Sequence, residues 1–281
     1  MLSRVSVICF AASYGVTLAL EVTRLLFRSG VRGALMLGFA GAGLVAHSIF
    51  LYHRWLDTRP GAIPLSNAMD WCLVAAWVLV VFYLFVMCYH PRTAVGLFIL
   101  PLVLGLIGVA RFVASDEPFP REANSKVWGL IHAGSILLGS VAVLIGSASG
   151  LMYLHQARRL KHKLPPRRGL RLPSLEWLQK TNSRTLTLAL LMIGLGMLSG
   201  IMLNAANYGG PSGWLPWDDP VVLSTALMFG WLFVWTAIGM AYRPAREGRR
   251  VAYHTLVSFL FLVLVLAMVL SGMTQHGGVR Q

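Results

Sequence analysis

Eight long apolar runs divide this chain, and each is long enough to cross a lipid bilayer as a helix. A helix needs about 20 apolar residues to span the hydrocarbon core, where its backbone polar groups must all be hydrogen-bonded internally. The runs are continuous rather than alternating, unlike the strands of a membrane barrel. The sequence therefore predicts an all-α integral membrane protein, a bundle of about eight transmembrane helices in a single polytopic domain, 1–281. The predicted spans are about 5–22, 31–51, 68–89, 94–113, 127–154, 185–206, 221–242 and 251–273.

The composition agrees with a membrane protein and excludes several functional classes. Apolar residues make up 57% of the chain, charged residues 12%, and the mean hydropathy is +0.68. A soluble domain of this size could not bury so much apolar surface. The three cysteines form no Cys-x-x-Cys pair, which argues against a thiol oxidoreductase. The spans contain almost no charged residues and no evident inverted repeat, which argues against a transporter.

Basic residues are distributed unequally between the two sets of connectors. The connectors after the first, third, fifth and seventh spans carry 17 Lys/Arg and three acids, whereas the opposite side carries seven of each. By the positive-inside rule, both termini and the loop 207–220 lie on the outer (periplasmic) side of a bacterial cytoplasmic membrane. The basic connector 155–184 is predicted to contact anionic lipid headgroups, with a short amphipathic helix starting at Pro173 and Ser174. No nucleic-acid binding is predicted.

Two histidines are placed on the outer side by this orientation. His132 lies a little over one turn into the fifth span, and His276 follows the last span. An imidazole in a membrane is a functional candidate because an unpaired ring nitrogen is costly in lipid. The alternative is a histidine that is hydrogen-bonded to a neighbouring helix or to headgroups. Neutral imidazole is a good axial ligand for haem iron, whereas the spacing shows no tight cluster for zinc.

The outer loop 207–220 has an unusual composition for a simple connector. Residues 208–220 read YGGPSGWLPWDDP, with two tryptophans, two aspartates and no cation. Trp214 and Trp217 can pack on a porphyrin, or they can be ordinary tryptophans of the membrane interface. Asp218 and Asp219 can orient a partner or a ligand, or they can cap the seventh span. Composition alone leaves both pairs of alternatives open.

The order of these parts resembles the CcsA-type cytochrome c assembly proteins, a haem-handling WWD-domain family that includes HemX-like members. PLSNAMDWCLVAAW (64–77) is similar to the early family segment, with Asp70 where an acid is usual. Residues 126–163 resemble the histidine-bearing span and its basic end. Residues 199–220 fall where the tryptophan-rich segment belongs, and 248–278 resemble the last span and its terminal histidine.

The resemblance implies a role and a set of site residues. His132 and His276 would be axial ligands of a non-covalent, b-type haem, with Trp214, Trp217 and Asp218 completing the binding site. The protein would present haem at the outer face for attachment to apocytochrome c, beside a CcsB-like (ResB-like) membrane partner with an external domain. It would be a delivery subunit rather than an enzyme by itself.

An alternative within the same family is a HemX-like, non-catalytic scaffold or regulator of tetrapyrrole metabolism. The outer loop departs from the family's usual tryptophan pattern. The family's inner-side histidine is also missing, because its position falls near Ala241. His254 is the candidate substitute.

Overall fold

The computed structural model describes residues 6–24, 31–57, 65, 67–91, 93–116, 126–163, 170–206, 217–241 and 248–271. Within these ranges the chain forms eight α-helices and no strand, so the predicted all-α architecture is confirmed. The helices are α1 (Val7–Thr23), α2 (Arg32–Asp57), α3 (Ala68–Tyr89), α4 (Gly96–Phe112), α5 (Lys126–Lys161), α6 (Leu175–Ala206), α7 (Pro220–Ala241) and α8 (Arg249–Leu270).

Six helices, namely α2, α3, α5, α6, α7 and α8, are long and apolar enough to cross a membrane. The other two, α1 and α4, are apolar helices of 17 residues each. At 1.5 Å per residue, 17 residues rise about 26 Å, which is near the lower limit for a span. The chain is therefore a multi-pass helical membrane protein.

The helix bounds differ most from the predicted spans at α6. The sequence predicts a short amphipathic helix and a separate span from about 185, but the structure has one helix that begins at Leu175. The side chain of Ser174 accepts a hydrogen bond from the backbone N–H of Trp177 and caps this helix (3.2 Å). The polar residues between these two predicted segments are helical, and Asn182 is buried at 1% exposure. Helices α2 and α5 also extend six and seven residues past the predicted ends, to Asp57 and Lys161.

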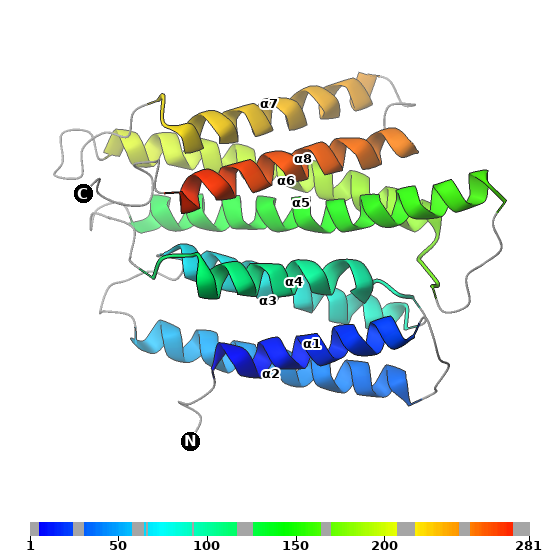
Figure 1. Ribbon diagram of the computed structural model, residues 1–281. Coiled ribbons are helices and arrows are strands. Elements are labelled where there is room, and N and C mark those ends of the chain that lie inside the picture. The colour runs from blue at the N-terminus through cyan, green and yellow to red at the C-terminus, as the bar shows by residue number, and fades with distance from the viewer. Residues whose placement is uncertain are drawn as a thin grey trace.

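Helix α5 joins the two halves of the bundle. In Figure 1 the helices run side by side, with α1 and α2 at one margin, α7 at the other and α5 between them. Helix α5 packs against α3 and α4 on one side and against α6 and α8 on the other. Its neighbouring residues Val143 and Leu144 belong to two different apolar clusters, one centred on α6 and α7 and one extending through α1 to α4. A single helix therefore has two buried faces.

The two ends of the bundle differ in their charged residues. We call the end at which α7 begins the Trp/Asp end, because Trp217, Asp218 and Asp219 lie there together with Asp70 and Asp116. We call the opposite end, where α5 ends and α8 begins, the basic end. Its described cations include Arg24, Arg158, Arg159, Lys161, Arg249 and Arg250.

An ion-pair cluster holds three segments together at the Trp/Asp end. The guanidinium of Arg54, on α2, pairs with Asp70 on α3 and with Asp116 after α4. The backbone N–H of Asp70 also donates to the side chain of Asn67, the cap of α3 (2.7 Å). Asp70 is the acid that carries part of the family resemblance, and its described contacts are structural. The cluster links α2, α3 and the C-terminal end of α4.

We expect Arg54→Gln to destabilise the protein by about 2 kcal/mol, because two carboxylates would lose their shared cation, one of them largely buried. Chemical unfolding in a mild detergent, followed by circular dichroism, would measure the loss. Lys180→Gln is the matched control, since Lys180 forms an exposed pair with Glu176 at the basic end. Equal, small effects of the two substitutions would show that the Arg54 cluster contributes little.

Candidate functional site

Helices α5 and α6 approach closely along a seam of three glycines. A Cβ at Gly139 would lie 2.7 Å from Cγ1 of Ile193, and one at Gly200 would lie 2.9 Å from Nδ1 of His132. Gly196 faces Ile136 in the same way. Apolar side chains gain nothing by leaving lipid for another helix, so membrane helices associate through such close backbone packing. The seam therefore fixes the register of α5 on α6.

His132 is oriented by this seam. Its Nδ1 lies 2.7 Å from the backbone carbonyl oxygen of Gly196, one turn before Gly200. A carbonyl oxygen only accepts, so Nδ1 carries the proton in this hydrogen bond. In the neutral imidazole the lone pair is then on Nε2, which is the tautomer that binds metal through Nε2. The seam thus selects both the ring orientation and the nitrogen that can act as a ligand.

The position of His132 suits a site near the membrane surface. It is the seventh residue of α5, which places it about 9 Å along the helix from Lys126 at the Trp/Asp end. Its side chain is half-buried. Ser199 donates a second hydrogen bond to the Gly196 carbonyl, at 2.9 Å. The acceptor that holds His132 is therefore itself part of a polar contact within α6.

The two predicted aspartates have different environments. Asp219 is 3% exposed, and its Oδ1 accepts a hydrogen bond from the backbone N–H of Val221 at 2.9 Å. Asp219 therefore caps α7, which confirms the capping alternative for this residue. Asp218 is exposed, and Trp217 beside it is 54% exposed. Among the predicted site residues that the structure describes, these two side chains are exposed.

The predicted site residues are only partly covered by the structure. His276 and Trp214 lie outside the described residues. His132, Trp217 and Asp218 lie at the same end of the bundle, and α6, against which His132 packs, also packs against α7. The structure thus places three of the five at the Trp/Asp end.

Two other histidines have packing roles. His47 is fully buried, and its ring stacks on Phe10 with centroids 4.1 Å apart. Its Nδ1 lies 3.4 Å from the hydroxyl of Tyr14 on α1. His90, at the end of α3, packs edge-on against Trp177, with centroids 5.8 Å apart. His47 corresponds to the alternative of a histidine hydrogen-bonded to a neighbouring helix, whereas His90 contacts α6 through its ring.

His254 lies against α7, on which the family's inner-side histidine is missing. Its ring stacks on Trp235 with centroids 3.4 Å apart, and Trp231 packs edge-on at 5.6 Å. A small cavity of about 40 Å³ adjoins these rings. Ala241, near which the family resemblance would place a histidine, is an exposed residue at the end of α7. An imidazole is therefore present beside α7, but it comes from α8.

Sequence reasoning missed the residue that orients His132. Its signal is the pair of small residues four apart, Gly196 and Gly200, a spacing that often marks a helix contact in membranes. The partner helix cannot be read from that spacing. Within the described ranges, no three His, Cys, Asp or Glu residues gather as a metal site.

The fold and these residues define a multi-pass helical membrane protein with a histidine held in a defined tautomer near one membrane surface. The sequence model of the family described as Cytochrome C assembly protein matches residues 36–275. The chain belongs to this family, which gives it a role in cytochrome c assembly.

Curated relatives match most of the chain at low identity. The cytochrome c biogenesis protein CcsA of Synechococcus sp. (strain CC9902) is 25% identical over 258 residues, which cover 83% of this chain and 82% of the relative. CcsA of Parasynechococcus marenigrum (strain WH8102) is 24% identical over 237 residues, 75% of each chain. CcsA of Synechococcus sp. (strain RCC307) is 25% identical over 264 residues, 85% and 81% of the two chains. No solved structure matches the chain.

We expect Gly200→Ala to destabilise the protein by about 1–3 kcal/mol, because the new methyl group would overlap the His132 ring and push the helices apart. Gly230→Ala is the control, because a Cβ at Gly230 would lie more than 4 Å from any heavy atom of a packed neighbour among the described residues. Unfolding in detergent would compare the two. Equal stability of both variants would show that the described approach of α5 and α6 is not close.

Proposed function

We propose that this protein binds haem at the Trp/Asp end and presents it, on the outer face of the membrane, for attachment to apocytochrome c. Haem is the cargo of this role rather than a resident catalytic group, and it is held non-covalently, as a b-type haem. Membership of the cytochrome c assembly family supports the general role. The named relatives, which are called cytochrome c biogenesis proteins, support it further.

The observation that carries the proposal is the hydrogen bond from Nδ1 of His132 to the Gly196 carbonyl. A histidine that ligates a metal commonly donates its other ring N–H to a carbonyl, which fixes the tautomer and raises the basicity of the ligand nitrogen. His132 has this arrangement on a closely packed helix pair. Its Nε2 is the proposed axial ligand of the iron.

The remaining predicted residues complete the proposed site. His276 supplies the second axial ligand, since it follows the span whose C-terminal end lies at the Trp/Asp end. Trp217 is exposed beside the start of α7, where its indole can cover a porphyrin face, and Trp214 is proposed to act in the same way. Asp218, exposed next to Trp217, is proposed to orient the partner or a ligand histidine. Bound iron would supply the coordination centre that these residues hold.

The proposed setting is a bacterial cytoplasmic membrane, with a CcsB-like (ResB-like) partner that carries an external domain. The partner and apocytochrome c would approach the same side as residues 207–220. Our proposal assigns this chain delivery and presentation of haem, and it assigns no bond-forming step to its residues.

Purified protein with haem available should show a Soret band, and the double variant His132→Ala/His276→Ala should retain at most about a tenth of the haem, since loss of both axial ligands leaves only the contacts of the macrocycle. Pyridine haemochrome analysis would measure haem per protein. His90→Ala/His162→Ala is the matched control and should retain haem as the wild type does.

Equal haem loss in both double variants would contradict the assignment of His132 and His276. Absence of haem from the wild type, together with a stable complex with a cytoplasmic tetrapyrrole-synthesis enzyme, would favour the HemX-like scaffold instead. Co-purification with a CcsB-like protein would support presentation.

The proposed orientation predicts that both termini are outside. Alkaline phosphatase fused to the C-terminus should be active, because the enzyme folds only on the outer side, whereas a fusion within 164–169 should be inactive. A fluorescent-protein fusion at each site gives the reciprocal readout. Activity of the fusion within 164–169 would reverse the orientation and remove the site from the outer face.

A further inference from the structure

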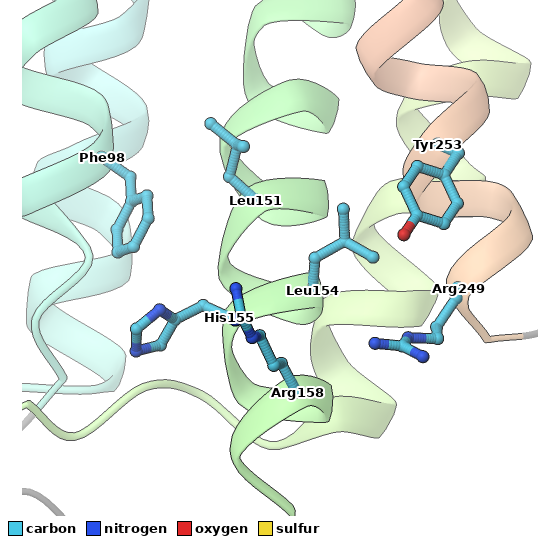
Figure 2. A pocket seen from close by; sticks show the side chains of 7 residues that line it. All are labelled: Phe98, Leu151, Leu154, His155, Arg158, Arg249 and Tyr253. Carbon is cyan, nitrogen blue, oxygen red and sulfur yellow. The ribbon is translucent and has the colours of Figure 1, made fainter. Parts of the chain in front are cut away.

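A groove of about 380 Å³ lies at the basic end, on the face of α5 between α4 and α8. It is lined by Phe98, Leu151, Leu154, His155, Arg158, Arg249 and Tyr253. Figure 2 shows these side chains gathered over α5, with the Arg249 guanidinium directed from α8 toward α5. No part of the proposed haem site contributes to it.

Polarity changes along the groove in one direction. Leu151 and Leu154 lie farther from the end of α5, whereas Arg158 lies within one turn of Lys161, the last residue of α5. Leu151 and Arg158 are seven residues apart, or about 10 Å along the helix. Figure 2 shows the three apolar side chains on one side of the two arginines. The groove is thus apolar toward the bilayer centre and cationic at the membrane surface.

The two arginines place positive charge at the mouth of the groove. Among the residues that the structure describes, neither Arg158 nor Arg249 has an acidic group within 4.0 Å, the limit met by the ion pairs elsewhere. Both are exposed. The fork of N–H donors on a guanidinium matches the oxygens of a phosphate, and two such groups from different helices can hold one phosphate between them.

We propose that this groove binds an anionic phospholipid, with its phosphate between Arg158 and Arg249 and an acyl chain along Leu151 and Phe98. A phospholipid in the bilayer has its charged headgroup at the membrane surface and its acyl chains toward the bilayer centre. The groove has its charged and apolar residues in the same order. Leu151 is 46% exposed and Tyr253 is 54% exposed, so the groove opens on the lateral surface of the bundle, which faces lipid. Basic pockets between membrane helices commonly hold anionic headgroups.

The bound lipid would contact three helices, α4, α5 and α8. Helix α5 packs against both α4 and α8, and the groove lies between those two contacts. A lipid at this position would fill the space over α5 and neutralise two charges that otherwise repel each other. The proposal is independent of haem binding, because all its residues lie at the basic end.

The test is lipid binding to the delipidated full chain in mild detergent, measured by native mass spectrometry with phosphatidylglycerol and phosphatidylcholine. We expect phosphatidylglycerol to bind more tightly than phosphatidylcholine. Arg158→Gln/Arg249→Gln should weaken phosphatidylglycerol binding by roughly 30-fold, from about fivefold for each arginine near an anionic headgroup. The matched control, Lys161→Gln/Arg250→Gln, removes the same charge at the same end but alters no residue of the groove, and should change binding little.

A second variant distinguishes the effect of the groove's shape from that of its charge. It also keeps the proposal testable if the arginine variant does not fold. Leu151→Trp fills the apolar part and keeps both arginines, so phosphatidylglycerol binding should fall while the net charge is unchanged. If Arg158→Gln/Arg249→Gln and the control Lys161→Gln/Arg250→Gln weaken phosphatidylglycerol binding equally, the proposal is overturned in favour of diffuse attraction to headgroups. Displacement of the lipid by inorganic phosphate or by protoporphyrin IX at concentrations below that of phosphatidylglycerol would also overturn it, because the groove would then hold a simple anion or a carboxylated macrocycle.

Discussion

The close approach of α5 and α6 is the contact on which the arrangement of the candidate site depends. Neither helix can gain free energy by removing leucine side chains from lipid, so the pairing relies on dense packing at Gly139, Gly196 and Gly200. Because these glycines lack side chains, the α6 backbone comes within hydrogen-bonding distance of His132. The same contact therefore provides helix association and orients an imidazole.

Helix α5 also determines how the rest of the bundle assembles around this pair. It packs against α3 and α4 in one half of the bundle and against α6 and α8 in the other. A displacement of α5 would move His132 at the Trp/Asp end and the groove residues at the basic end together. The two proposed sites share this helix but differ in chemistry. One uses the oriented imidazole of His132 and the exposed indole of Trp217, and the other uses two arginines beside apolar side chains.

Several features could be predicted from the sequence because they depend on local composition. Helix α3 has the bounds expected from its apolar run, and Asp219 caps α7 as one of the two alternatives proposed. The predicted short helix from Ser174 and the predicted span from about 185 are one continuous helix, α6, which the polar residues between them, such as Asn182, do not indicate. In the folded protein Asn182 is buried among neighbouring helices, and only packing can show this. The pairing of Arg54 with Asp70 and Asp116 likewise joins residues far apart in sequence.

The sequence by itself determined the class of protein, because apolar runs of this length have no other stable solution than membrane helices, and its motifs indicated the family and the histidines worth testing. Only the tertiary structure decided which nitrogen of His132 donates to α6, that His254 lies on Trp235, and that Arg158 and Arg249 line one groove. The physical reason is that hydropathy specifies which segments enter the bilayer. The rotation and register of one helix on another depend on side-chain shape at contacts that the chain makes only after folding.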